Sequence, residues 1–505
     1  MRRLLGAALL LILAGVTSPG AATPPIEPGR ILDHIKFLAS DDLRGRANGS
    51  PELERAGRYI ADAFTSAGLK PAGSNGDWFQ PFELVAGVAI GDGNVLEMRT
   101  RTTSVRLALG RSYYPLAATP SESATILHDV PVVFAGYGIS APGLNYDDYD
   151  RLDVRDKAVL IFSHEPQEQQ RDSRLNGARP IRETTLYAKA MAARTRGARA
   201  LLVVSDPTHA TDQANYRSFP VDPDPEDQGI PVLRVGRDEL APLIRELDLD
   251  ARAAMIDRDL IPRSRALTGV TIDYTQALTT NRRTVRNVVG ILAGADAVRG
   301  QEAIVFGGHY DHVGLGGRFS AAPDKTGEIH NGADDNASGI AALIEIARAA
   351  AADRSRFPRS LVFVAFAGEE RGLLGSAHYT SDPSVPLAST VAMLNLDMVG
   401  RAGGRVEVGG MSTAALRDDV EAAARVAGLD ARPGGPGAGR SDDSSFLDRH
   451  VPALHFFTGF HDDYHAPSDD WPRIDAAGTA RVATLALELA ARLAARADRL
   501  PFAGP

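Results

Sequence analysis

Short apolar segments that end in acidic or histidine residues alternate with amphipathic segments in the C-terminal half of this chain. The apolar segments are rich in Val, Phe and Leu, which is typical of strands buried on both faces; they are residues 303–308, 360–367, 391–397, 405–410 and 452–459. Helical periodicity marks the segments 338–351, 413–428 and 475–497. This alternation predicts an α/β fold with helices on both faces of one sheet.

The rest of the chain has a different pattern, and 505 residues are too many for one compact core. Two helical segments fall within residues 30–70. Between 113 and 275, short apolar segments at 130–139, 157–162, 198–205 and 230–235 are separated by proline-containing loops and one helix near 184–196. We therefore expect a β-rich domain at 113–275, inserted between residues 23–112 and 276–505, which together form the larger domain.

The N-terminus has the pattern of an export signal. Arg2 and Arg3 precede a short apolar stretch at residues 4–16, and small residues at 20–22 offer a cleavage site. The apolar stretch is too short to span a bilayer, and no later segment is long enough. Residues 1–22 therefore predict an exported protein, periplasmic or secreted, without stable membrane insertion.

Charge and cysteine content narrow the possible partners and sites. The net charge of −9 argues against a nucleic-acid partner. Cysteine is absent, so the chain forms no disulfide and builds no thiolate site. Any bound metal ion must be held by His, Asp and Glu.

Acids and histidines gather where the predicted strands end. Ligands of open α/β sheets bind beyond the carboxyl ends of the strands. Carboxylates buried there are costly unless they are paired or bind a metal ion, and two histidines with three carboxylates suit zinc or a related divalent metal. The side chains in question are His309, Asp311, Asp334, Asp335, Glu369, Glu370, Asp397, Tyr464 and His465.

Five motifs in order carry a family resemblance: GGHYDH (307–312), GADDNASG (332–339), AGEE (367–370), LDMVG (396–400) and YHAPSD (464–469). Residues 281–480 resemble the di-zinc aminopeptidases of the M28 metallopeptidase family, and residues 30–85 resemble the start of the same domain. The segment 113–275 is similar to the protease-associated (PA) domain that some members carry. The resemblance implies the zinc-exopeptidase (phosphorylase/hydrolase-like) mixed sheet.

The same resemblance implies two Zn²⁺ ions per chain and their ligands. His309 and Asp397 would bind one ion, Glu370 and His465 the other, and Asp335 would bridge them. The peptide bond after Asp335 is expected to be cis. A further residue, Asp311, would orient the His309 imidazole.

The adjacent acids Glu369 and Glu370 then divide two tasks. Glu370 would bind a metal ion, while Glu369 would accept the proton of a metal-activated water and pass it to the leaving amine. By resemblance to some members, the Tyr464 hydroxyl would stabilise the oxyanion. The predicted activity is removal of N-terminal residues from peptide substrates.

Several nearby residues are interpreted structurally. We expect Asp334 to orient its loop and Ser338 to cap the following helix. Four histidines are expected to be hydrogen-bonded polar residues: His312, His330, His455 and His461. Relatives often have a histidine where this chain has Asp443; Asp442 and Asp443 could receive an α-amino group, although a solvated turn is the favoured interpretation.

Other functions on this scaffold stay open. A carboxypeptidase or dipeptidase would need an arginine for the terminal carboxylate, and Arg371, Arg401 and Arg440 are candidates. A glutaminyl cyclase fits less well because that class resembles a single-zinc version without the insertion. A non-catalytic binding ectodomain would have lost ligands, and all of them are present here. The sequence leaves the oligomeric state open.

Overall fold

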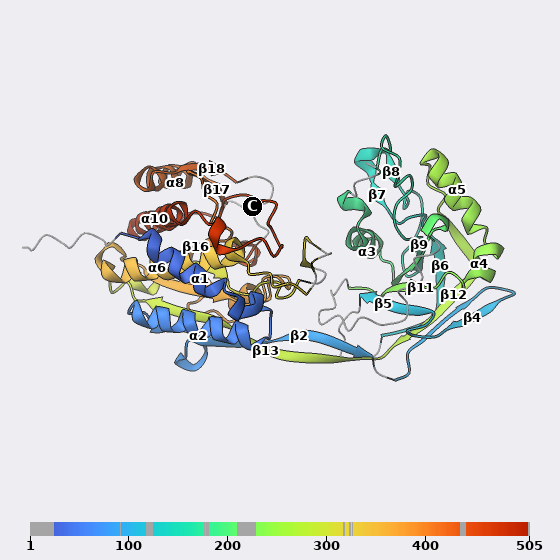
Figure 1. Ribbon diagram of the computed structural model, residues 1–505, viewed down its shortest axis with the longest axis horizontal. Helices are drawn as coiled ribbons and strands as arrows, with labels where there is room; N and C mark the ends of the chain where they lie inside the picture. Colours follow the sequence, from blue (N-terminus) through green and yellow to red (C-terminus); the bar gives the residue numbers. More distant parts are fainter. Residues whose placement is uncertain are drawn as a thin grey trace, which may run out of the picture. The chain divides into compact units, whose positions relative to one another are not determined.

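The computed structural model describes residues 25–90, 92–117, 125–175, 177, 181–209, 229–316, 319–322, 325, 327–434 and 441–502. The predicted export signal at 1–22 and Arg440 lie outside these residues. The chain divides into two compact units (Figure 1): one comprises residues up to 84 together with 284 onward, and the other comprises residues 85–283. The inserted PA domain at 113–275 stays a prediction.

A mixed sheet forms the centre of the first unit. Its strand order is β1-β13-β15-β14-β16-β19-β17-β18, with β2 also paired to β13. The four central strands β15, β14, β16 and β19 are mutually parallel, so their carboxyl ends share one edge. The strands are β1 (Lys70–Pro71), β2 (Phe79–Ile90), β13 (Leu278–Leu292), β14 (Ala303–His309), β15 (Ser360–Phe366), β16 (Thr390–Leu396), β17 (Arg405–Gly409), β18 (Asp430–Pro433) and β19 (Ala453–Phe457).

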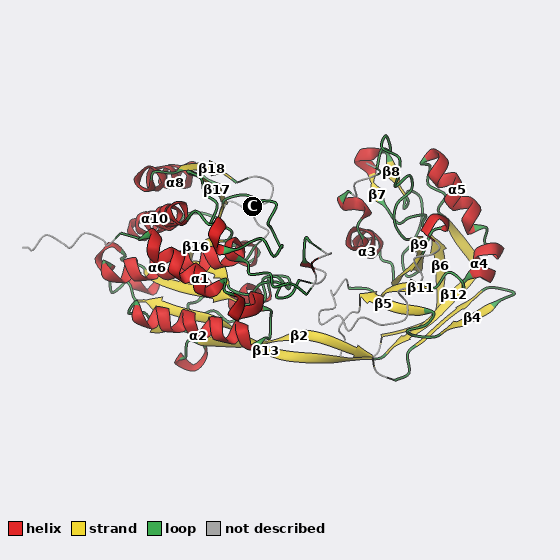
Figure 2. Cartoon of the chain, in the orientation of Figure 1, coloured by secondary structure: helices red, strands yellow, loops and turns green. Residues whose placement is uncertain are grey.

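Both faces of the central strands are buried. Successive side chains of a strand point to opposite faces. On one face Val305 and Val362 share a core with Tyr379 of α7 (Leu374–Ser381) and Phe446 of α9 (Asp443–Leu447). On the other face, the Phe363 ring stacks on the Phe306 ring of β14 and lies 6.1 Å from the ring of Phe64 in α2 (Pro51–Ser66). The predicted α/β class is therefore confirmed (Figure 2).

The helices predicted for this unit lie within a few residues of their expected positions, whereas α7 and α9 were not predicted. α6 contacts β14, β15 and β16, and α10 packs on α6 and α8. They are α1 (Pro28–Leu38), α2 (Pro51–Ser66), α6 (Gly339–Ala352), α7 (Leu374–Ser381), α8 (Ala414–Ala427), α9 (Asp443–Leu447) and α10 (Ala476–Ala495). Helix α2 begins after Ser50, whose hydroxyl accepts a hydrogen bond from the Leu53 N–H.

The start of α6 differs from the prediction. Ser338 makes no side-chain capping bond; its hydroxyl donates to the Asp334 carbonyl at 2.8 Å. The Asn336 side chain accepts from the Gly339 N–H at 3.0 Å instead. A π-helical segment, Ala333–Ser338, leads into α6 and turns Ser338 back on the preceding loop. The Asp335–Asn336 peptide bond is cis, as expected.

The second unit has its own sheet, ordered β4-β3-β12-β6-β9-β10-β11-β5. Strands β6, β9, β10 and β11 are parallel, and the other pairs are antiparallel. Alternate residues of β9 belong to two separate cores, so this strand is buried on both faces. The elements are β3 (Val95–Arg99), β4 (Ser104–Leu107), β5 (Tyr113–Ala117), β6 (Thr125–Phe134), β7 (Ser140–Ala141), β8 (Tyr146–Asp147), β9 (Ala158–Phe162), α3 (Leu186–Thr195), β10 (Ala200–Val204), β11 (Val232–Val235), α4 (Ala241–Glu246), α5 (Leu249–Asp259) and β12 (Arg265–Gln276).

Among the described residues, no helix combines the length and the apolar character needed to cross a bilayer.

Candidate metal centre

The carboxyl ends of three neighbouring parallel strands carry the predicted ligands to one edge of the first sheet. His309 is the last residue of β14, Glu370 follows β15, and Asp397 follows β16 directly. Asp335 comes from the π-helical segment before α6, and His465 from the loop after β19. The structure therefore brings together five side chains that are far apart in the sequence.

Three of them form a first group around His309. Its Nε2 atom lies 3.2 Å from Asp335 Oδ1 and 3.3 Å from Asp397 Oδ1. The ligand atoms of this group all lie within 4.8 Å of one another. His309 is 1% exposed and Asp335 3%, so these charges have little contact with water.

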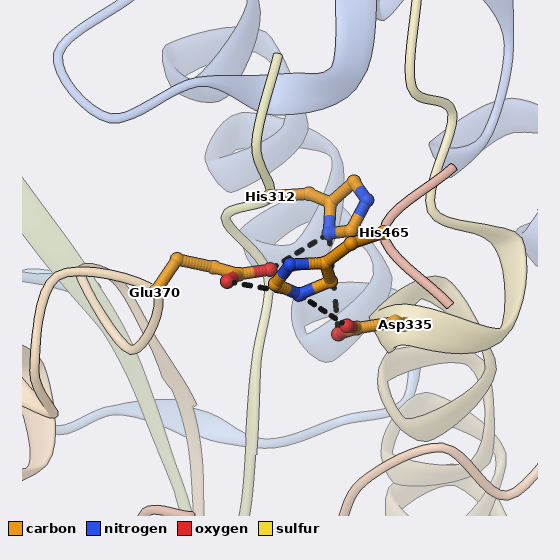
Figure 3. A group of neighbouring side chains, drawn as sticks. All are labelled: His312, Asp335, Glu370 and His465. Atoms are coloured by element: carbon orange, nitrogen blue, oxygen red, sulfur yellow. Dashed lines mark hydrogen bonds and ion pairs between the residues drawn. The ribbon is translucent and has the colours of Figure 1, made fainter. Parts of the chain in front are cut away.

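A second group shares Asp335 with the first (Figure 3). His465 Nε2 lies 3.1 Å from Asp335 Oδ2 and 3.2 Å from Glu370 Oε2. The two oxygens of Asp335 thus face different histidines, Oδ1 toward His309 and Oδ2 toward His465. A carboxylate placed in this way is suited to bridge two cations.

Sequence reasoning missed His312 as a member of the second group. Its Nδ1 atom lies 2.8 Å from Glu370 Oε1 and 4.0 Å from Asp335 Oδ1 (Figure 3). The ring is buried, and its Nε2 atom has no hydrogen-bond partner. The sequence offered one sign of this role, the position of His312 three residues after His309. Because His312 lies beyond the end of β14, strand periodicity does not predict the direction of its side chain.

Gly332 makes room for this arrangement. Its φ is +58°, which favours glycine, and a Cβ atom there would lie 2.5 Å from the His312 ring and 2.2 Å from the Asp335 carbonyl oxygen. The loop can therefore pass His312 closely only without a side chain at this position.

The pKa values of the adjacent Glu369 and Glu370 shift in opposite directions. Burial raises the pKa of Glu369 well above its usual range, with the nearby charges of Glu370 and Asp397 adding to the effect. Burial acts in the same direction on Glu370, but His465 and His312 outweigh it and lower the pKa of Glu370 to about 2. One acid is thus a paired anion and its neighbour readily holds a proton.

The carboxylates of the cluster raise the pKa values of His309 and His465. Burial disfavours the charged form of both rings, but the surrounding carboxylates outweigh it. They hold the pKa of His309 well above its usual value and raise the pKa of His465 to about 11. The carboxylates therefore favour positive charge at both rings, and a metal ion is another way to supply it.

Asp311 acts on the glutamates as well as on His309. Its carboxylate accepts the backbone N–H groups of Glu369 at 3.2 Å and Glu370 at 3.3 Å, and the Asn48 amide donates to it at 2.6 Å. His309 Nδ1 lies 3.2 Å from the Asp311 carbonyl oxygen and 3.8 Å from its carboxylate. Asp311 thus ties the turn after β15 to the end of β14.

The donor set fits divalent metal ions of the zinc type. Histidine nitrogens and carboxylate oxygens are borderline and hard ligands that zinc accepts. His312, Asp335, Glu370 and His465 form one group of possible ligands, and His309, Asp335 and Asp397 form another. Zinc at this edge of the sheet is therefore compatible with the residues present.

Comparison with known proteins identifies this part of the chain. The family model described as peptidase family M28 matches residues 287–490. These residues form a peptidase family M28 domain.

A probable zinc metalloprotease of Pyrenophora tritici-repentis is 42% identical over 96 residues, or 19% of this chain and 20% of that protein. Aminopeptidase YwaD of Bacillus subtilis is 34% identical over 119 residues, 23% of this chain and 22% of that one. The chain thus spans about a fifth of the length of these relatives.

A solved structure shares the fold of the whole chain. An aminopeptidase from Aneurinibacillus sp. strain AM-1 superposes with a TM-score of 0.54 at 21% identity, covering 95% of this chain and 96% of that one. At this level of identity the likeness concerns the fold.

A cavity of about 230 Å³ opens onto the ligand groups of the M28 domain. Glu369, Asp397 and Tyr464 are among its lining residues. The Tyr464 ring stacks on His465 with centroids 4.0 Å apart and meets Phe460 edge-on at 5.0 Å. Aromatic and apolar side chains complete the wall: Met398, Phe457 and Phe460. The cavity thus lies beside the two groups of possible metal ligands.

The interpretation of Asp442 and Asp443 as a solvated turn is wrong. Asp442 is fully buried and Asp443 is 2% exposed. Burial raises the pKa of Asp442 to about 7, and Asp443 Oδ1 lies 3.3 Å from His455 Nδ1. Both acids are therefore buried where α9 begins, Asp442 immediately before the helix and Asp443 as its first residue.

Asp334, His330 and His461 have polar partners, as expected. The Asp334 carboxylate accepts the Gly400 N–H at 2.6 Å and lies 3.0 Å from His461 Nε2. His330 Nε2 lies 2.8 Å from the Ser320 hydroxyl. Arg401, a candidate for binding a substrate carboxylate, is paired with Asp463 and Asp469.

Proposed function

We propose that this chain is a co-catalytic di-zinc aminopeptidase that removes N-terminal residues from peptides. The observation that supports it most is the shared carboxylate of Asp335 between two histidine–carboxylate groups. The matched family and the relatives named zinc metalloprotease and aminopeptidase support the same activity. Export to the periplasm or medium belongs to the proposal.

The proposed ligands form two sets. His309, Asp335 and Asp397 would hold one zinc ion. The bridging Asp335, with Glu370 and His465, would hold the other. When bound, the two ions lower the pKa of a water molecule and polarise the scissile carbonyl.

Glu369 would move the proton. It lines the cavity, its Oε2 lies 4.0 Å from His309 Nε2, and it follows β15 beside the ligand Glu370. The surroundings that raise its pKa suit a group that takes a proton from water and returns it to the leaving amine. Asp311 would hold this turn through its two backbone hydrogen bonds.

Tyr464 would act on the substrate oxygen. Its ring packs against His465 and Phe460, and the residue lines the cavity. A hydroxyl held beside the scissile carbonyl can stabilise the negative charge that develops on its oxygen.

A peptide panel tests the proposal. The full chain is assayed on free peptides, on N-acetylated peptides and on C-amidated peptides of one sequence, with and without a metal chelator. We expect cleavage of the free and C-amidated peptides, no cleavage of the N-acetylated ones, and loss of activity with the chelator that zinc restores. Loss of cleavage on C-amidation would favour a carboxypeptidase, and full turnover after metal removal would refute the metal mechanism.

A further inference from the structure

A second histidine–carboxylate cluster lies in the unit formed by residues 85–283. It is built at the carboxyl ends of the neighbouring parallel strands β9 and β10. His164 and Glu168 belong to the loop after β9, and Asp206 and His209 to the loop after β10. In such sheets this edge is where ligands bind.

Glu168 lies between the two histidines. Its Oε1 atom lies 3.3 Å from His164 Nδ1, and its Oε2 atom lies 3.1 Å from His209 Nε2. The ligand atoms of His164, Glu168 and His209 are all within 4.8 Å of one another. Two donors bound to one zinc ion at a tetrahedral angle, each about 2.0–2.2 Å away, lie about 3.3–3.6 Å apart. The observed separations are near that value.

One of these contacts is not a hydrogen bond. Glu168 Oε2 is buried and has no hydrogen-bond partner, although His209 Nε2 is 3.1 Å away. A nitrogen and an oxygen converge in the same way in the M28 domain, where His465 Nε2 lies 3.1 and 3.2 Å from two carboxylate oxygens. A buried carboxylate oxygen without a donor indicates a missing positive group.

Asp206 contacts the His209 ring nitrogen that is farther from Glu168. Its Oδ2 lies 2.8 Å from His209 Nδ1, which leaves Nε2 directed at Glu168. Asp206 is 1% exposed and is itself held by the Thr208 N–H at 2.8 Å and the His209 N–H at 3.2 Å. A carboxylate behind a histidine is the usual device that orients a metal-binding imidazole.

Carboxylates lie around the cluster. Asp206 and Glu165 are buried and Glu168 is half-buried, and all three act electrostatically on the ammonium of Lys189. That ammonium donates a hydrogen bond to the His164 carbonyl oxygen. Both carboxylate oxygens of Glu165 are buried without a hydrogen-bond partner. A divalent cation would supply further positive charge to these carboxylates.

We propose that His164, Glu168 and His209 bind one divalent transition-metal ion, with zinc as the best match to two imidazoles and a carboxylate. Asp206 acts as the positioning residue for His209. The site is separate from the M28 domain and does not depend on the proposed function.

Binding requires one ring to turn. The two imidazoles are stacked, with centroids 3.8 Å apart and an angle of 4° between the planes. A metal ion lies near the plane of each imidazole that binds it, so parallel rings cannot both direct a lone pair at one ion. His164 is the more exposed ring, at 30% against 22%, and lines a cavity of about 190 Å³. We expect His164 to rotate and the ion to enter from this cavity.

Metal counting on the full chain tests the site. The protein is stripped with chelator, saturated with Zn²⁺, dialysed, and its zinc is measured per chain. Glu168→Gln and His209→Ala each should remove one equivalent relative to the wild type, while activity on peptides stays unchanged. His128→Ala is the matched control, because His128 lies in the same unit, is 84% exposed and pairs with Asp273 away from the cluster; it should keep the wild-type zinc content.

A second measurement uses the wild type alone and so does not depend on whether the variants fold. In the wild type, NMR signals of the His164 and His209 rings should shift together when one further equivalent of Zn²⁺ is added, since the stack opens. Equal zinc content in the wild type and Glu168→Gln, or ring signals that stay unmoved by zinc, would overturn the proposal. Loss of the M28 activity would leave this difference in zinc content intact, so the two proposals fail independently.

Discussion

His312 Nδ1 lies 2.8 Å from Glu370 Oε1, while the other oxygen of Glu370 faces His465. The His312 ring also meets the His465 ring edge-on, with centroids 5.4 Å apart. His312, which was expected to be an ordinary polar residue, therefore contacts one oxygen of the Glu370 carboxylate while His465 contacts the other.

Replacing His312 should weaken metal binding at one position. An asparagine amide can occupy the place of Nδ1 and donate to Glu370, whereas leucine cannot. We expect His312→Leu to lower the affinity of the Glu370–His465 position by about 10–100-fold, and His312→Asn to restore most of it. Competition with a chromophoric chelator measures both. Equal losses in the two variants would instead make His312 a direct ligand.

Glu369→Gln should remove activity and leave metal binding intact. Glutamine has the same shape but cannot accept a proton, and general acid–base catalysis contributes about 10²–10⁴-fold. We expect kcat to fall by about that factor with an unchanged zinc content. A variant that keeps more than a tenth of the wild-type kcat would assign Glu369 a structural role.

Asp311→Asn should loosen the turn that carries both glutamates. An amide offers one acceptor oxygen where the carboxylate now accepts the N–H groups of Glu369 and Glu370. We expect about 10–100-fold weaker metal binding, measured by chelator competition. Asn48→Ala is the comparison, because it removes a donor to Asp311 and keeps its acceptors; a larger loss there would contradict the role given to Asp311.

Glu345 predicts an acid-sensitive contribution to stability. Burial raises its pKa, but hydrogen bonds from His34 and Arg348 and the charge of Arg30 outweigh this and lower the pKa to about 2. Because the folded-state pKa is below the unfolded-state value, the contribution is present above about pH 4.5 and is lost as the pH falls toward 2. We expect Glu345→Gln to cost about 2–3 kcal/mol at pH 7.

Urea unfolding at several pH values tests this. The difference in unfolding free energy between the wild type and Glu345→Gln should shrink steadily between pH 5 and pH 3. A difference that stays constant over this range would mean that the Glu345 carboxylate contributes no charge-dependent stability.

Ser338 and Asp443 mark the limits of sequence reasoning at the centre. The pattern around Ser338 predicts a cap, but the π-helical segment gives the capping bond to Asn336. The charged run at 442–443 favours a solvated turn, but both acids are buried where α9 begins. In both places tertiary packing outweighed the preference of the local sequence.

By itself, the sequence determined the α/β class and the order of the donors along the chain. Buried parallel strands must be continuous and apolar, and they bring their carboxyl ends to one edge, so His309, Glu370 and Asp397 could be expected to meet. Only the tertiary structure decided the place of His312 and the contact of His164 with His209. These side chains belong to loops, where no period links sequence position to direction, and packing alone sets which of them converge.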